Sequence, residues 1–327
     1  MRSTCSLYVD AGYLLASAAT RVTGTSLRNG VHVEYGRLIA SLIAEAEERT
    51  GLPVLRVHWY DSARNGVPDA QQERIGELSK VKLRLGRFGV DGQQKGVDLR
   101  IGLDLVAHAR NGAADVFFLV SGDDDLTEAV EEAQVHGVQV VVLAVPSANG
   151  RPHGVSRHLI RAADELDVLS PGAIDDAVMK IEVPRQPEPA VAVSVPQPPT
   201  RTSSGANGLP MPSPLDLAAI PRPGQPTAPA AVLAYRATTG EQPVAMPGYE
   251  DLSDHDDQIS AVVTKVLSSF RQSASPEDLA ALKSARPSIP RDIDRALLVD
   301  MSDALGVYDL NEQIRYRLRE RFWDQLD

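Results

Sequence analysis

Apolar residues in the first half of the chain fall into short unbroken runs, separated by stretches with helical spacing. Runs of this length without polar alternation are typical of strands that a parallel sheet buries on both faces. They predict strands over residues 5–9, 54–60, 116–120 and 138–145. Between them, the spacing of the apolar residues predicts helices over residues 34–50, 69–79, 98–110, 125–136 and 156–163. Strands that alternate with helices predict an α/β fold with a mostly parallel sheet.

Other segments of this half carry turn-forming or alternating patterns. Ala11-Gly12-Tyr13 is predicted to turn the chain after the first strand, and residues 20–30, rich in Thr, Ser, Arg and Gly, predict an exposed loop. Residues 80–85 alternate strictly between charged and apolar side chains, which predicts a strand with one face in the core. Its other face is then a solvated strand edge or a contact for a polyanion, formed by the basic ridge Lys80, Lys82 and Arg84.

The second half of the chain changes composition abruptly. Residues 184–247 are rich in Pro, Ala, Gln, Ser, Thr and Gly without apolar periodicity, so they cannot bury enough surface to offset the entropy of ordering them. Beyond them, apolar spacing predicts a small set of helices, the last over residues 310–326. We therefore expect an α/β domain, a disordered Pro/Ala-rich linker and a small C-terminal all-α domain, over residues 1–170, 171–250 and 251–327.

Charge and composition narrow the function classes. A formal net charge of −11 argues against broad non-specific binding to DNA, although carboxylates that bind a metal would also contribute to this excess. The single cysteine, Cys5, excludes an intrachain disulfide and a cysteine-rich zinc site. No 18-residue apolar stretch and no signal-peptide run is found, so we expect a cytoplasmic protein without membrane association.

Acidic residues cluster where predicted strands end or helices begin. Asp123 and Asp125 follow the strand at residues 116–120, Asp10 ends the first strand, and Asp98 begins a helix. A single acidic residue at such a place is explained as a helix cap, but several at equivalent places favour a site at the carboxyl ends of the strands. Asp104 lies on the same helix as Asp98, about 120° around it, so the two are not expected to bind one ion squarely.

Carboxylates without clustered His or Cys favour a particular kind of metal. An all-oxygen set suits Mg²⁺ or Mn²⁺ rather than Zn²⁺. A divalent ion on carboxylates activates water and stabilises the charge of a phosphodiester displacement. Neither a G-x-G-x-x-G nor a G-x-x-x-x-G-K-[ST] loop follows any predicted strand, so dinucleotide and P-loop nucleotide binding lose support.

The order of the short motifs resembles the NYN domain, a branch of the PIN-like nucleases, and within it the LabA-like group. The resemblance covers about residues 5–169 and includes Lys-Gly-Val-Asp at 95–98 and Ser-Gly-Asp-Asp-Asp at 121–125. It implies a Rossmann-like PIN fold and a metal-dependent ribonuclease that acts on RNA. By this resemblance Asp10, Asp98, Asp123 and Asp125 hold or orient the metal, and Asp104 acts through water. The implied substrate contacts are Ser121, Lys95, Lys80, Lys82 and Arg84.

One position departs from the family pattern. Many NYN proteins carry Asn three residues after the first Asp, and here that residue is Tyr13. A non-catalytic scaffold that binds RNA or a protein partner is therefore the alternative to a nuclease. A phosphatase of the haloacid dehalogenase type is disfavoured, because Gly12 stands where its motif needs a second Asp. Assembly with a second copy or another protein through the helical domain is also expected. The RNA recognised, and endo- versus exonucleolytic cleavage, stay open.

Overall fold

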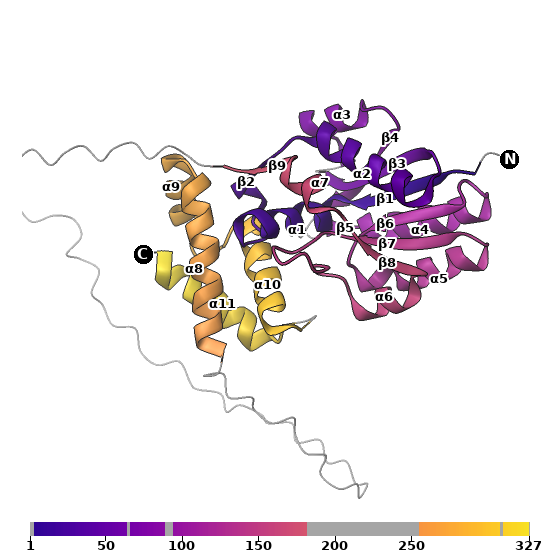
Figure 1. The fold of residues 1–327 in the computed structure, drawn as a ribbon. Helices are drawn as coiled ribbons and strands as arrows, with labels where there is room; N and C mark the ends of the chain where they lie inside the picture. Colours follow the sequence, from indigo (N-terminus) through magenta and orange to yellow (C-terminus); the bar gives the residue numbers. More distant parts are fainter. Residues whose placement is uncertain (1–2, 64–65, 89–93, 182–254, 308–309, 327) are drawn as a thin grey trace, which may run out of the picture. The chain divides into compact units, whose positions relative to one another are not determined.

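A mostly parallel sheet forms the centre of the N-terminal half. The structure is a computed structural model of the 327-residue chain and describes residues 3–63, 66–88, 94–181, 255–307 and 310–326. The sheet has seven strands in the order β5-β4-β3-β1-β6-β7-β8, of which only β5 runs antiparallel to its neighbour (Figure 1). The strands are β1 (Cys5–Asp10), β3 (Val54–Ala63), β4 (Val81–Phe88), β5 (Gln94–Lys95), β6 (Val116–Val120), β7 (Gln139–Ala144) and β8 (Glu165–Val168). The predicted α/β class is confirmed.

Helices cover both faces of this sheet, because alternate side chains of each strand point to opposite faces. Leu7 and Val9 of β1 join the core beneath α1 and α2, whereas Tyr8 joins the core beneath α4 and α5. The helices of this half are α1 (Ala11–Thr23), α2 (Tyr35–Thr50), α3 (Ala70–Gly76), α4 (Val97–Arg110), α5 (Thr127–Val135), α6 (Arg157–Ala162) and α7 (Pro171–Asp175). Both faces of the central strands are therefore buried, as their unbroken apolar runs predicted.

The segment after β1 differs from its prediction. The turn expected at residues 11–13 is the start of α1, and Asp10 caps this helix by accepting from the backbone N–H of Gly12 at 2.7 Å. A turn was predicted because Gly12 disfavours a helix: glycine inside a helix lowers its stability by about 1 kcal/mol relative to alanine. The expected exposed loop at residues 20–30 is also wrong in part, since Thr25, Ser26 and Leu27 are buried.

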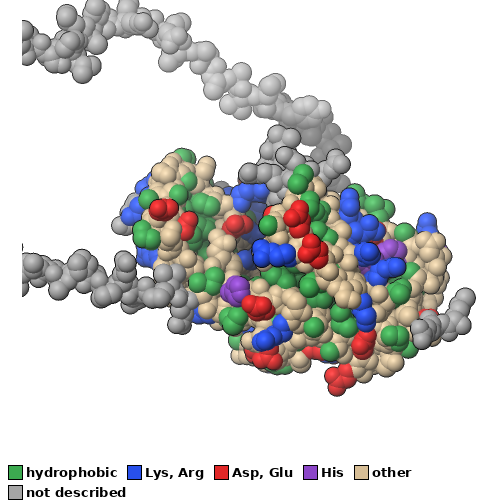
Figure 2. All heavy atoms as spheres, turned by 90° about the horizontal axis from the view of Figure 1, so that it is seen from above, with side chains coloured by type: hydrophobic (Ala, Val, Ile, Leu, Met, Phe, Trp, Pro, Cys, Tyr) green, Lys and Arg blue, Asp and Glu red, His purple; other side chains and the backbone are tan. Residues whose placement is uncertain are grey.

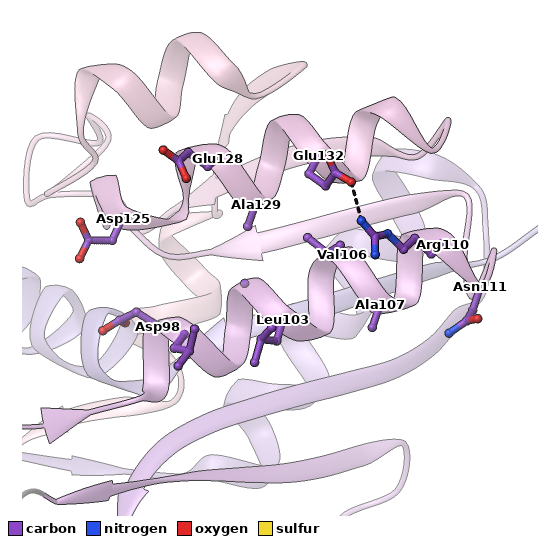
Figure 3. Close-up of a pocket in the computed structure, with 12 residues that line it drawn as sticks. Asp98, Leu103, Val106, Ala107, Arg110, Asn111, Asp125, Glu128, Ala129 and Glu132 are labelled. Atoms are coloured by element: carbon purple, nitrogen blue, oxygen red, sulfur yellow. Dashed lines mark hydrogen bonds and ion pairs between the residues drawn. The ribbon is translucent and has the colours of Figure 1, made fainter.

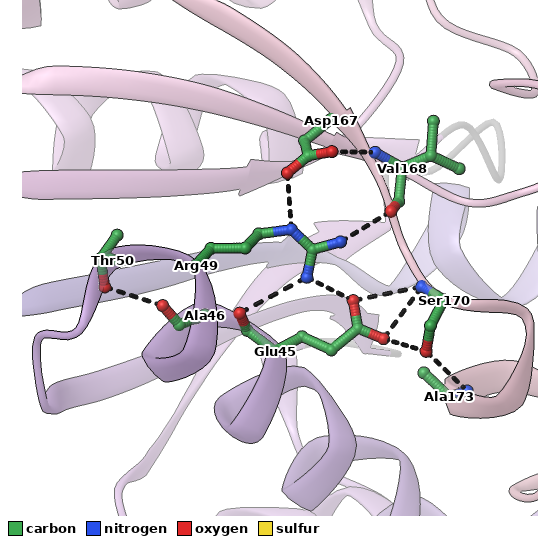
Figure 4. A network of polar contacts seen from close by, with 8 residues as sticks. All are labelled: Glu45, Ala46, Arg49, Thr50, Asp167, Val168, Ser170 and Ala173. Carbon is green, nitrogen blue, oxygen red and sulfur yellow. Dashed lines mark hydrogen bonds and ion pairs between the residues drawn. The ribbon is translucent and has the colours of Figure 1, made fainter.

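The folded N-terminal half extends past residue 170, where the linker was expected to begin. Residues Pro171–Asp175 form α7, and β9 (Val178–Lys180) pairs antiparallel with β2 (Val31–Val33). Figure 4 shows how this end is held: the Arg49 guanidinium bonds Asp167 and the carbonyl of Val168, while the Glu45 carboxylate accepts from Ser170. These long-range polar contacts leave no signal in local composition. The remainder of the predicted linker lies outside the described residues.

The C-terminal part of the chain is helical as predicted, and its last helix agrees with the predicted range of residues 310–326. The C-terminal helices are α8 (Asp256–Ser273), α9 (Pro276–Ser284), α10 (Arg291–Leu305) and α11 (Glu312–Leu326). Their shared core also contains Leu27 from the N-terminal half, and the described residues before 182 and from 255 onward form one compact unit. A separate C-terminal domain stays a prediction. Over the described residues, no helix combines the length and the apolar character that a membrane crossing needs.

Candidate functional site

The strand order creates a switch point beside β1. From β1 the chain builds β3 and β4 on one side of it, then crosses over through α4 to place β6 on the other side. In open parallel sheets, ligands bind outside the carboxyl ends of the strands at such a reversal. Asp10 ends β1, and Ser121 to Asp123 follow β6, so the acidic motifs of the sequence flank this switch point.

Asp10 is the most buried carboxylate of the site. Its side chain is 8% exposed and accepts from the Gly12 N–H. Burial raises the pKa of Asp10 to about 6, and the negative charge of Asp98 adds to this rise. The backbone hydrogen bonds and the positive charge of Arg295 act in the opposite direction. These contacts compensate the ionised form of Asp10 only in part, since the net effect of its surroundings is a raised pKa.

Asp98 belongs to the same group of charges. It lies in the first turn of α4, at one end of a groove of about 880 Å³ between α4 and α5, with Asp125 at the same end (Figure 3). Burial raises the pKa of Asp98, and the nearby charges of Asp123 and then Asp125 raise it further. The charge of Asp98 thus acts on Asp10, and the charges of Asp123 and Asp125 act on Asp98, so electrostatic interactions link the four predicted metal ligands.

The turn that carries Asp123 is held by its own polar groups. The Ser121 side chain is fully buried and its hydroxyl accepts from the Asp123 N–H at 3.3 Å. Asp123 in turn accepts from the Asp125 N–H at 3.0 Å. A Cβ at Gly122 would lie 1.8 Å from the carbonyl oxygen of Gly154, so only glycine fits there. Ser121 shapes this turn from inside the protein and is not exposed to a substrate.

Asp104 is placed away from the carboxylate group. Its side chain accepts from the Tyr60 hydroxyl at 2.9 Å and pairs with the Arg84 guanidinium at 2.9 Å. Of the predicted basic ridge, Arg84 is thus engaged with Asp104, and Lys80 pairs with Glu47 at 3.1 Å. Lys82 is exposed. The side chain of Lys95 lies outside the described residues.

Tyr13, the departure from the family pattern, has a structural role. Its hydroxyl donates to the His153 carbonyl at 2.7 Å and accepts from the Val145 N–H at 3.2 Å. The side chain therefore ties α1 to the β7–α6 loop (residues 145–156). Burial raises the pKa of Tyr13, which keeps the hydroxyl neutral. Because the Tyr13 hydroxyl makes these two bonds to backbone groups, it does not take the place of the Asn side chain that would orient a metal-bound water.

The sequence did not indicate the contacts that three charged residues, Arg28, Arg295 and Asp124, make near the site. Arg28, from the 3₁₀ turn η1 (Arg28–Gly30), donates to the Gly12 carbonyl at 2.9 Å, and Arg295 of α10 influences the pKa of Asp10 and Asp98. Asp124 accepts from the Ser156 hydroxyl at 2.6 Å and contacts His158 at 3.1 Å, which lowers its pKa. The two arginines gave no motif, because each reaches the site only through tertiary packing.

The carboxylate oxygens of this site are chemically suited to bind Mg²⁺. Within the part of the chain that the structure describes, no group of three His, Cys, Asp or Glu side chains is arranged to hold one metal ion. Mg²⁺, however, is usually bound by one or two carboxylates, with water and substrate phosphate as further ligands. Burial and the charges of neighbouring aspartates raise the pKa values of Asp10 and Asp98, so a divalent cation would stabilise the ionised form of both side chains.

The fold and the site define the class: an α/β protein with a carboxylate group at the switch point of a parallel sheet. A family model described as the NYN domain matches residues 5–169, about half of the chain, and the chain belongs to this family. The NYN domain is part of the PIN-like nuclease superfamily, whose nucleases generally use divalent metal ions, and the domain suggests RNA as a substrate or partner.

The individual relatives add no function of their own. An uncharacterized protein, y4oD, of Sinorhizobium fredii is 39% identical over 101 residues, which are 31% of this chain and 47% of that protein. The matched region thus spans about half the length of this relative. A crystal structure of a protein of unknown function, VPA0982, of Vibrio parahaemolyticus matches at 20% identity with a TM-score of 0.38, over 54% of this chain and 98% of its own.

Proposed function

We propose that this protein is a metal-dependent ribonuclease that hydrolyses RNA phosphodiester bonds with Mg²⁺ or Mn²⁺. The observation that carries the proposal is the grouping of buried and like-charged carboxyls at the switch point, which raises the pKa of both Asp10 and Asp98. Such a group is unfavourable unless a cation or a proton compensates it. Membership of the NYN family supports the same reaction class.

In this proposal Asp10 and Asp98 bind the metal directly, and Asp123 and Asp125 bind it or orient its water ligands. A bound divalent ion supplies an activated water and stabilises the negative charge of the displacement. The Gly12 N–H holds the Asp10 carboxylate in place, and the Ser121 hydroxyl holds the turn that carries Asp123. We assign Asp104 no direct part, since Tyr60 and Arg84 engage it. Lys82 stays a candidate phosphate contact.

We also propose that, within the NYN family, this protein belongs to the LabA-like group. The second candidate function is an RNA- or protein-binding scaffold without cleavage. Tyr13 favours it, because its hydroxyl is bonded to backbone and no amide stands at that position.

The deciding experiment is cleavage of a mixed single-stranded RNA pool by the full chain with Mn²⁺, Mg²⁺ or EDTA. We expect metal-dependent cleavage that Asp10→Asn and Asp98→Asn each reduce by about 100-fold or more, since loss of even an outer partner of a metal ligand costs 10–100-fold. Asp324→Asn removes the same charge from an exposed site on α11 and should cleave like the wild type. Undiminished cleavage in EDTA or in the variants would refute the proposal. RNA binding without cleavage under any metal would favour the scaffold.

A further inference from the structure

A cavity of about 980 Å³ opens beside the carboxylate group. One wall contains Asp10, Tyr13 and Asp123, and a second contains α10 with Arg295. The third wall runs from Arg151 in the β7–α6 loop to His158 in the first turn of α6. The C-terminal helices thus contribute directly to the surroundings of the site proposed above.

Acidic and basic groups converge at one point of this cavity. A Cβ built on Gly12 would lie 2.8 Å from Asp10 Oδ1, 3.3 Å from Arg295 Nη2 and 3.5 Å from Arg28 Nη2. Arg295 is exposed at the cavity, whereas Arg28 is half-buried and bonded to the Gly12 carbonyl. The Arg295 guanidinium is therefore next to the carboxylate group while its side chain stays accessible from the cavity.

Two further arginines line the same cavity. Arg151 and Arg157 are both exposed, and over the described residues neither side chain takes part in an ion pair. On the face seen in Figure 2, Lys and Arg (blue) are mixed with Asp and Glu (red) and do not form one continuous basic surface. Arg151, Arg157 and Arg295 thus share one cavity with Asp10 and Asp123.

Specific contacts hold α10 in this position. The Ser26 N–H donates to Asp300 at 2.9 Å, and Leu27 is fully buried in the core of the C-terminal helices. On the other side of the cavity, His153 lies 3.5 Å from Asp303. The wall that carries Arg295 is thus attached both to the segment before η1 and to the β7–α6 loop.

We propose that this cavity binds the phosphate backbone of single-stranded RNA, with Arg295, Arg151 and Arg157 as the phosphate contacts. The proposal deepens the ribonuclease function and rests on it. Carboxylates repel a phosphodiester, so a substrate needs cations immediately beside them to approach. Guanidinium groups suit this role, because their planar donors match two phosphate oxygens. The C-terminal helices are then part of the RNA-binding site.

The test is binding of a fluorescein-labelled single-stranded RNA to the full chain in EDTA, measured by anisotropy at several salt concentrations. We expect Arg295→Gln to weaken binding about tenfold and to reduce the salt slope by about 0.7, the contribution of one phosphate contact on a single strand. Arg157→Gln should act similarly, and Arg295→Lys should recover part of the loss. Lys283→Gln removes one charge from an exposed position on α9 outside the cavity and is the matched control.

The outcomes separate this proposal from the ribonuclease function. Weakened binding in Arg295→Gln and Arg157→Gln with an unchanged control supports the RNA site, even if no preparation cleaves RNA. Wild-type affinity in both variants, or an equal loss of affinity in Lys283→Gln, overturns the proposed RNA-binding cavity. The ribonuclease proposal is unaffected by that result, because it depends on the aspartates. Tighter binding or faster cleavage in Arg295→Gln also overturns the proposed RNA-binding cavity, since Arg295 would then block the site. A wild-type chain that binds no RNA in EDTA overturns this proposal and leaves metal-dependent cleavage to its own test.

Discussion

The residues of this site have two roles: some carry the negative charge, and others fix the conformation of the surrounding loops. Asp10 and Asp98 are held near other carboxyls at an electrostatic cost, whereas Tyr13 and Gly122 fix the loops around them. The Tyr13 hydroxyl satisfies the N–H of Val145, a fully buried residue. Replacing Tyr13 by the family's Asn would therefore remove a structural contact as well as introduce an amide.

At this scale we predict that Tyr13→Phe lowers the free energy of unfolding by about 1–3 kcal/mol, because a buried N–H loses its acceptor. Denaturant unfolding followed by circular dichroism measures the change. Tyr316→Phe removes the same hydroxyl from a side chain that is 69% exposed and should leave stability unaltered. Equal effects of the two substitutions would mean that the Tyr13 hydrogen bonds contribute nothing.

Elements pack around a second group of polar side chains on the α4 face of the sheet. His58 of β3 stacks on Tyr8 of β1 at 5.0 Å between ring centroids and lies 4.7 Å from the ring of His108 on α4. The Tyr8 hydroxyl is 2.9 Å from His108 Nδ1, but His58 Nδ1 is buried without a partner. Burial lowers the pKa of His58 from 6.5 to about 4, and the neighbouring His108 adds to this effect.

The low pKa of His58 makes the packing of these elements sensitive to acid. Between pH 6.5 and 4 the unfolded chain binds a proton at His58 that the folded chain does not, so stability falls as the pH falls. The loss is at most about 1.4 kcal/mol per pH unit in that interval and levels off below it.

We predict that His58→Phe, which keeps the stacked ring, gives a shallower loss of unfolding free energy between pH 6.5 and 4 than the wild type. Urea unfolding at half-unit pH steps measures both slopes, and their difference isolates His58 from other titrating groups. His32→Phe replaces an exposed imidazole and is the control. Parallel curves for wild type and His58→Phe would contradict the prediction.

At the scale of the whole molecule, the two folded halves share a core. Leu27 follows α1 in the sequence, yet its side chain is fully buried among residues of the C-terminal helices. A Cβ at Gly30 would lie 2.8 Å from the hydroxyl of Ser269 on α8, which shows how closely the chain segments approach there. The position of Arg295 at the acidic site depends on this packing.

We predict that Leu27→Ala destabilises the full chain by about 2–5 kcal/mol, the usual cost of truncating a fully buried leucine. Because Leu27 also positions α10, the substitution should weaken RNA binding in the same direction as Arg295→Gln. Leu55→Ala removes the same atoms from a side chain that is 38% exposed and should change stability far less. An unaltered unfolding curve for Leu27→Ala would show that the halves are not coupled through this residue.

The elements were predicted well because their signals are local. Unbroken apolar runs such as Val116–Val120 identify buried strands, and helical spacing identifies α2, α4 and the C-terminal helices. Helix α1 was missed because Gly12 is a local breaker, whereas in the structure the missing Cβ makes room for Asp10 and two arginines. Asp104 and Ser121 were placed in the site by motif alone, and their actual partners come from other elements or from the turn itself.

The sequence by itself determined the α/β class and predicted a group of four aspartates at the carboxyl ends of the strands. It could do so because hydrophobic periodicity and strand ends are properties of neighbouring residues. Only the tertiary structure decided that Arg28 and Arg295 face Asp10, that Tyr13 is a structural tie, and that Leu27 belongs to the core of the C-terminal helices. These contacts join residues far apart along the chain, and no local pattern encodes which distant side chain will meet another.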